Sequence, residues 1–122
     1  MDIKIKRVYE PASPDDGMRL LVDRLWPRGI KKVDLAFDDW AKCLTPSTEA
    51  RKAFGHKAEN LETFAGRYTA ELNTNPEAAA YVEKLRAAAP DTITLLYAAK
   101  DPQVNHAIIL QKWLTEKLEA AQ

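Results

Sequence analysis

The chain has 122 residues, of which 46% are hydrophobic and 30% charged, a balance typical of one globular domain with an ordinary core. Lysine and arginine together number 18, as do aspartate and glutamate, so the composition lacks the basic excess of proteins that bind nucleic acid non-specifically. The sequence has no run of about 18 apolar residues, so no membrane span is predicted. It has no apolar stretch near its start, so no signal peptide is predicted. With a single cysteine excluding an intrachain disulfide, these features predict a cytoplasmic protein.

Patterns typical of β-strands occur in three segments, residues 3–9, 19–23 and 92–98. The first alternates apolar and charged side chains, which predicts an edge strand with one face in water. The last is nearly all apolar and β-prone, which predicts the central strand of the sheet. Between the first two strands, residues 10–16 predict a loop. Residues 31–44 give a mixed pattern, in which a loop or short helix is expected to pack three side chains on the core: Leu35, Phe37 and Trp40.

Capping residues predict four helices, which begin at Thr45-Pro46 or Ser47, at Asn60, at Asn75-Pro76 and at Asp101-Pro102. The last three carry apolar stripes at spacings of three and four residues, as helices that pack on a core do. The stripes are Leu61, Phe64, Tyr68 and Leu72; Ala78, Val82, Leu85 and Ala89, before Pro90; and Ala107, Leu110, Leu114 and Leu118.

These elements predict a single α/β domain over residues 1–122, with a small mixed or mostly parallel sheet and helices packed on it. No repeat, low-complexity tract or linker divides the chain. In such sheets, ligands bind beyond the carboxyl ends of the strands. We therefore expect the turn after residue 22 and the connection over residues 98–106 to face one another across one pocket.

The segment DGMRLLVDRLWPRG, residues 16–29, runs from a strand pattern into a turn with two arginines. Arg24 and Arg28 carry guanidinium forks that suit a carboxylate or a phosphate. Trp26 offers a flat face to a base or sugar, although a tryptophan after a strand more often serves packing. Asp23 is either a catalytic acid or the partner of an arginine in a pair that locks the turn, and we favour the structural role.

The connection after the third strand supplies the other half of the expected pocket. If Asp101 caps the last helix, the N–H groups of residues 103–106 attract an anion beside Lys100. His106 would then act as an acid or a base. The alternative is purely structural, with Asp101 as a plain cap, Asn105 satisfying loop carbonyls and Lys100 in solvent. For this segment alone the structural alternative is somewhat favoured.

The sequence predicts no metal and no cofactor. One cysteine and two histidines give no recognisable spacing of zinc ligands. The four glycines form neither a phosphate loop nor a dinucleotide fingerprint. Cys43 beside Trp40 and Leu44 is typical of a small core residue rather than of a nucleophile paired with His56 or His106.

Two blocks of the sequence resemble those of a known family: LVDRLWPRG from Leu21 and TLLYAAKDPQVNHAIIL from Thr94. With residues 7–11, Trp40 and residues 45–47, they are similar to domain of unknown function family 488, in its YeaO-like branch. The resemblance spans essentially the whole chain. It implies a compact α/β intracellular protein of bacterial type, and it brings no assigned activity.

The resemblance also implies a broader sister group with a cysteine in the last strand and a Cys-His-Arg tripeptide at the start of the last helix. Here these positions hold Tyr97 and Asn105-His106-Ala107, so only the histidine is shared. Thiol or metal chemistry of that group therefore does not carry over to this chain.

The favoured hypothesis is that the protein binds an anionic small molecule, such as a phosphorylated one. Arg24 and Arg28 would clamp the anion, and His106 with Asp23 would transfer protons. The candidate ligand-binding residues are Arg24, Trp26, Arg28, Lys100, Asp101 and Asn105.

Two other hypotheses remain at this point. In the second, the protein is a nucleic-acid-associated module in which Trp26 stacks a base and the basic patch from Arg24 to Lys32 follows the backbone, unless that patch is simply solvated. In the third, the protein is a non-catalytic interaction domain that presents the arginine turn to an acidic partner. No membrane partner is expected, and the oligomeric state is left open.

Overall fold

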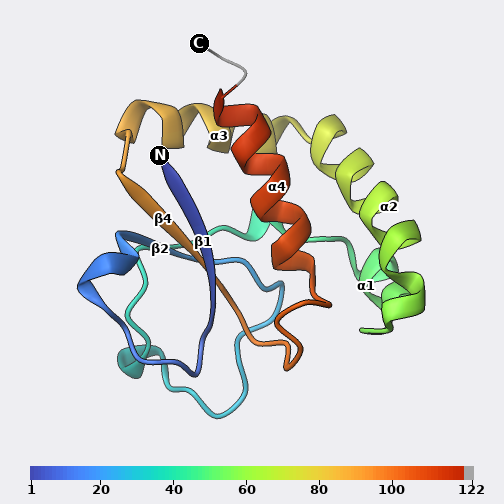
Figure 1. Ribbon diagram of the computed structural model, residues 1–122, viewed down its shortest axis with the longest axis horizontal. Helices are drawn as coiled ribbons and strands as arrows, with labels where there is room; N and C mark the ends of the chain where they lie inside the picture. The colour runs from blue at the N-terminus through green and yellow to red at the C-terminus, as the bar shows by residue number, and fades with distance from the viewer. Residues whose placement is uncertain (120–122) are drawn as a thin grey trace.

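The computed structural model describes residues 1–119, and strand β4 (Thr92–Tyr97) is central to it. β4 pairs in parallel with β1 (Asp2–Arg7) on one side and with β2 (Met18–Leu21) on the other (Figure 1). A two-residue strand, β3 (Asp39–Trp40), extends the sheet beyond β2, also in parallel. The order is therefore β1-β4-β2-β3, and the predicted central strand and edge strand are both confirmed. The sequence pattern missed β3.

The described residues contain four α-helices: α1 (Thr48–Phe54), α2 (Leu61–Thr74), α3 (Pro76–Ala88) and α4 (His106–Glu119). The predicted caps at Ser47 and Asn75 are confirmed, since their side chains accept hydrogen bonds from the N–H groups of residues 50 and 77. Asn60 precedes α2 but caps no N–H group of it. None of the helices within residues 1–119 is both long and apolar enough to cross a lipid bilayer.

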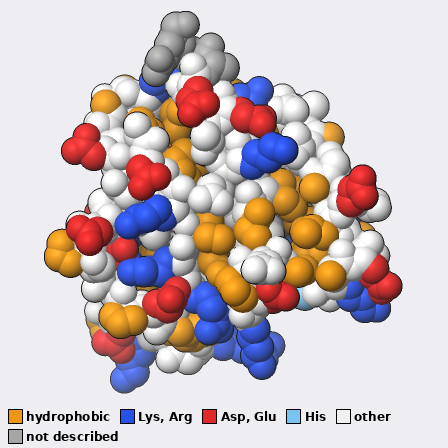
Figure 2. All heavy atoms as spheres, viewed as in Figure 1, with side chains coloured by type: hydrophobic (Ala, Val, Ile, Leu, Met, Phe, Trp, Pro, Cys, Tyr) orange, Lys and Arg blue, Asp and Glu red, His pale blue; other side chains and the backbone are white. Residues whose placement is uncertain are grey.

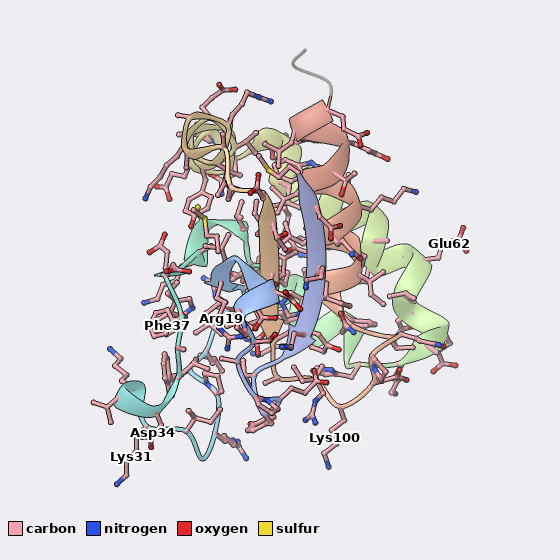
Figure 3. The ribbon with its side chains drawn as sticks, turned by 60° about the vertical axis from the view of Figure 1, so that its left-hand side comes forward. Arg19, Lys31, Asp34, Phe37, Glu62 and Lys100 are labelled. Atoms are coloured by element: carbon pink, nitrogen blue, oxygen red, sulfur yellow. The ribbon has the colours of Figure 1, made fainter. Side chains whose placement is uncertain are left out.

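The helices and the loops cover opposite faces of the sheet. Helices α1, α2 and α4 lie together on one side, while α3 crosses the end at which the strands begin (Figure 1). Successive residues of β2 point to opposite faces, so Leu20 joins the core under the helices and Leu21 joins a smaller core under the loops. Figure 3 separates the two layers, with Phe37 among the loops and Glu62 on a helix of the other side. The sequence-predicted single α/β domain is confirmed, with all four described strands parallel.

The loop layer is built from the long connection between β2 and β3. The Trp26 ring lies edge-on to the rings of Phe37 and Trp40, with centroids 5.7 and 5.6 Å away. Its indole N–H donates to the carbonyl oxygen of Ile30 over 2.6 Å. Leu35 is buried in the same cluster, so the predicted packing of this segment on the core is confirmed. Aromatic side chains thus cover a sheet face that helices leave bare.

The predicted start of the last helix at Asp101 is wrong, because α4 begins at His106. Asn105 occupies the capping position, where its side-chain oxygen accepts from the N–H of Ile108 over 3.1 Å. Its amide nitrogen donates to the carbonyl oxygen of Asp101 over 2.8 Å. An asparagine serves both groups, whereas an aspartate carboxylate only accepts. Asp101 instead stabilises a turn, accepting from the N–H of Gln103.

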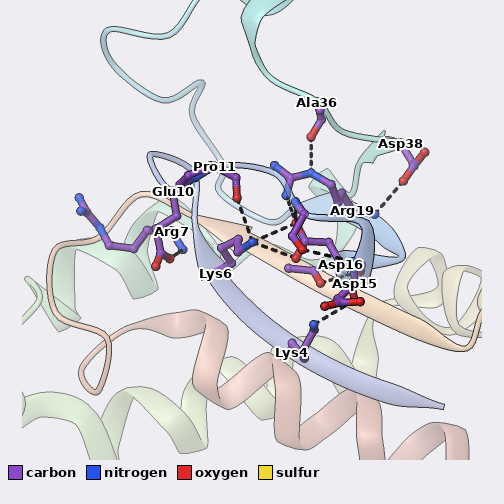
Figure 4. A network of polar contacts seen from close by, with 12 residues as sticks. Lys4, Lys6, Arg7, Glu10, Pro11, Asp15, Asp16, Arg19, Ala36 and Asp38 are labelled. Atoms are coloured by element: carbon purple, nitrogen blue, oxygen red, sulfur yellow. Dashed lines mark hydrogen bonds and ion pairs between the residues drawn. The ribbon is translucent and has the colours of Figure 1, made fainter.

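A buried ion cluster joins β1, β2 and the loops between them (Figure 4). Asp16 is 2% exposed and accepts from Nζ of Lys6 over 2.9 Å, from Arg19 and from the N–H of Ser13 over 3.0 Å. Arg19 also donates through Nε to the carbonyl oxygen of Ala36. Burial alone would raise the pKa of Asp16, but the bonds from Lys6, Ser13 and Arg19 outweigh it and lower the pKa to about 2.

Replacing Asp16 by asparagine should lower the free energy of unfolding by about 3 kcal/mol at neutral pH, because Lys6 and Arg19 would lose their shared counter-charge. Since folding lowers the pKa of Asp16 from 3.8 to about 2, its contribution is full above about pH 4 and is lost as the pH falls toward 2. Urea unfolding at a series of pH values should therefore show that the difference in free energy of unfolding between wild type and Asp16→Asn becomes smaller as the pH falls from neutral to 2. A difference that stays constant would contradict this account. Asp15→Asn, at an exposed neighbour, is the control.

Candidate functional site

A cleft of about 810 Å³ opens beside the carboxyl ends of β2 and β4. Most of its wall comes from three segments, which are residues 23–28 after β2, residues 98–106 between β4 and α4, and residues 46–56 around α1, and Tyr9 and Phe64 complete it. The structure thus brings the arginine turn and the connection after β4 together, with Arg28 and His106 both lining the cleft. This placement agrees with the general position of ligand sites in open parallel sheets.

Asp23 fixes the geometry of this cleft. Its Oδ2 accepts from the N–H of Ala98, just beyond β4, over 3.0 Å. Its backbone carbonyl oxygen accepts from the indole N–H of Trp40 over 2.7 Å. Its other carboxylate oxygen, Oδ1, is buried and lies 3.2 Å from Nε2 of His106. Asp23 therefore ties the turn to the end of β4 through a backbone N–H and not through an arginine, while its Oδ1 has no hydrogen-bond partner in the described residues.

His106 connects the start of α4 to the end of β2. Its Nε2 lies 2.7 Å from the carbonyl oxygen of Val22. A carbonyl oxygen can only accept, so we assign the proton of this contact to Nε2. Only Nδ1 is then left to accept a proton from a ligand. The side chains of His106 and Asp23 are 14% and 16% exposed, so both lie deep in the wall of the cleft.

Five cationic side chains line the cleft: Arg24, Arg28, Arg51, Lys52 and Lys100. Arg24 reaches the carbonyl oxygen of Pro46 at 3.5 Å, and the other four make no side-chain hydrogen bond or ion pair within the described part of the chain. The two carboxylates of the lining, Asp23 and Asp101, each accept from a backbone N–H. Lysine and arginine side chains gather at the lower edge in Figure 2, and Lys100 projects from the same end in Figure 3. The cleft therefore carries a local positive excess on a chain of zero formal charge.

Aromatic rings form one side of the cleft. Phe54 and Phe64 stack with centroids 4.3 Å apart, and His56 stacks on Phe54 at 5.8 Å. Sequence reasoning missed Arg51, Lys52 and these rings as neighbours of the arginine turn. Their only sequence signal is an adjacent basic pair on a short helix, and nothing local shows which helix borders the sheet edge.

Tyr68 packs behind this wall, where its ring stacks on that of Phe64. It is fully buried, and its hydroxyl donates to the carbonyl oxygen of Leu44. Burial raises the pKa of Tyr68 well above its usual value, and the charges of Asp23 and Glu71 raise it further. Tyr68 is therefore a neutral donor that holds α2 to the chain before α1.

The predicted site residues divide into two groups. Those in the lining of the cleft are Asp23, Arg24, Trp26, Arg28, Lys100, Asp101 and His106. Asn105 lies outside the lining, is fully buried and uses its amide within the protein. The N–H groups of residues 103–105 precede α4, so the expected anion cradle in a first helical turn over residues 103–106 is wrong. Within residues 1–119, no three His, Cys, Asp or Glu side chains are grouped to hold a metal ion.

Comparisons with known proteins identify relatives of this chain by sequence. A family model described as the inactive DUF488-N3 subclade matches residues 2–122. The chain is 50% identical over 114 residues to "Uncharacterized protein YeaO" of Escherichia coli (strain K12), covering 93% of this chain and 97% of that protein. It is 38% identical over 112 residues to "Uncharacterized protein Rv3073c" of Mycobacterium tuberculosis (strain ATCC 25618 / H37Rv), covering 92% of each. No solved structure shows significant similarity.

Replacing Asp23 by alanine should lower the free energy of unfolding by about 2 kcal/mol, because the N–H of Ala98 loses its partner at the cleft wall. Hydrogen exchange at the Ala98 amide should accelerate in parallel. Asp101→Ala is the matched control, since its exposed carboxylate accepts only from Gln103 and its loss should cost little. Equal destabilisation by the two substitutions, measured by urea unfolding, would show that Asp23 does not hold the cleft.

Proposed function

Because the chain belongs to the DUF488 family, in the subclade described as inactive, we propose that it binds a small anionic ligand, such as a phosphorylated one, without catalysing acid–base chemistry. The observation that carries this proposal is the positive excess of the cleft. Five cationic side chains and two engaged carboxylates line one concavity at the carboxyl edge of the sheet. A ligand with negative charge would neutralise the positive excess of the cleft.

The two arginines of the turn are the best placed to hold an anion. Arg28 has no side-chain partner among the described residues, and Arg24 has only the distant carbonyl oxygen of Pro46. The second half of the turn is held by two hydrogen bonds, because Trp26 donates to Ile30 and the hydroxyl of Tyr9 donates to the carbonyl oxygen of Arg28 over 2.9 Å. A fixed backbone reduces the entropy that ligand binding would cost.

His106 and Asp23 act in this proposal as positioning residues. The carbonyl oxygen of Val22 engages Nε2 of His106, and the N–H of Ala98 engages Oδ2 of Asp23. Both side chains are thus occupied with joining β2, β4 and α4. Their contacts support a structural role, in agreement with the description of the subclade as inactive.

A small ligand is favoured over a nucleic-acid backbone. An extended backbone needs a continuous basic stripe, whereas these cations surround a cleft. The Trp26 ring already contacts Phe37 and Trp40, and Lys32 lies over it at 5.9 Å. A single-stranded oligonucleotide that binds more tightly than pyrophosphate at equal ionic strength would favour the nucleic-acid alternative instead.

Calorimetric titration with inorganic pyrophosphate at low ionic strength should show binding that weakens as salt is added. The double variant Arg24→Gln/Arg28→Gln should lose about tenfold in affinity per arginine, since a hydrogen bond to a charged group is worth about 1.5 kcal/mol. Its melting temperature should stay near that of wild type, because both side chains are exposed.

The control for this experiment is Lys31→Gln/Lys112→Gln, which removes the same charge from exposed positions outside the cleft. This variant should bind pyrophosphate as wild type does. Absence of binding to the wild-type protein, or equal loss in both double variants, would overturn the proposed function.

A further inference from the structure

His56 has an unusual backbone conformation at the rim of the cleft. Helix α1 ends at Phe54, Gly55 caps it with φ 56°, and His56 follows with φ 58°, in the left-handed region. This conformation is strained for a residue with a Cβ, whereas glycine adopts it freely. The surrounding fold must therefore hold His56 in place, and the result is a ring fixed beside the cleft.

The imidazole ring of His56 lies flat against the ring of Phe54 at the edge of the cleft. It stacks on Phe54 at an interplanar angle of 23°, and Phe54 stacks in turn on Phe64 at 7°. Both phenylalanines are 4% exposed, so they form a rigid base under the ring. His56 itself is exposed and lines the cleft, and no other aromatic ring in residues 1–119 packs on it. One face of the imidazole is thus available to a planar group.

The volume of the cleft favours a ligand larger than a phosphate group alone. A volume of about 810 Å³ lies in the range of pockets that enclose organic molecules of drug size, and far exceeds the space that a phosphate group needs. Arg51 and Lys52 border the same end as His56, and their charges make that end unfavourable for an aliphatic chain. A planar polar heterocycle suits both the imidazole face and this charged border.

We propose that the ligand is a nucleoside phosphate, with its base stacked on His56 and its phosphate held by Arg24, Arg28 and Lys100. This inference rests on the proposed function, because it names the class of anion that the cleft binds. The cations of the turn and the ring after α1 belong to different walls of one concavity, as the two ends of such a ligand require. Stacking on an aromatic ring tolerates different bases, so the class is nucleoside phosphates in general.

The test compares three probes by calorimetry: adenosine monophosphate, ribose 5-phosphate and pyrophosphate. Wild type should bind adenosine monophosphate about tenfold more tightly than ribose 5-phosphate, because only the nucleotide has a base to stack. His56→Gly should remove most of that difference and leave the affinity for ribose 5-phosphate unchanged. The variant should also be at least as stable as wild type, because glycine accepts φ 58° without strain.

His56→Asn is the second variant, since asparagine tolerates the left-handed conformation but has no ring. It should lose affinity for adenosine monophosphate as His56→Gly does, which separates loss of the ring from greater backbone freedom. Equal affinity of wild type for the nucleotide and the sugar phosphate, or full nucleotide affinity in both variants, would overturn the nucleoside assignment. Pyrophosphate binding would still stand in that case, whereas its absence would overturn the proposed function itself.

Discussion

The contact between the Asp23 carboxylate and the N–H of Ala98 determines how the rest of the cleft is arranged. It joins the turn after β2 to the end of β4, which are the two segments that carry most of the predicted site. His106 adds the start of α4 through the carbonyl oxygen of Val22. Each of these bonds joins a side chain to a backbone group, so together they fix the main chain from which Arg24 and Arg28 project.

The one-sided placement of the helices explains why the cleft exists. The helices pack on one face of the sheet, so the aromatic side chains of loops cover the other face. The turn between β2 and β3 packs in this second layer. Trp26 is held there by Phe37 and Trp40. The arginines on either side of Trp26 are exposed and line the space between the sheet edge and α1. The position of Arg24 and Arg28 at the cleft is thus a consequence of how the second core is filled.

Periodicity predicted the elements with strong local patterns, such as the apolar central strand and the stripe of Phe64, Tyr68 and Leu72. It missed β3, because two residues cannot carry a pattern, and it placed the start of α4 at Asp101 because an aspartate before proline is a common cap. The sequence predicted the part of the site in which charged residues directly follow a strand. Arg51 and His56 were missed because their place beside the cleft depends on tertiary packing, which no local signal records.

Amide chemical-shift mapping by NMR, with pyrophosphate added to the isotope-labelled protein, tests the central claim most directly because it locates any bound anion on the molecule. The account predicts that the shifts concentrate in residues 23–28, 51–56 and 98–106, which converge on the cleft. Shifts centred on the exposed basic residues Lys31 and Lys32, or spread evenly over the surface, would contradict it.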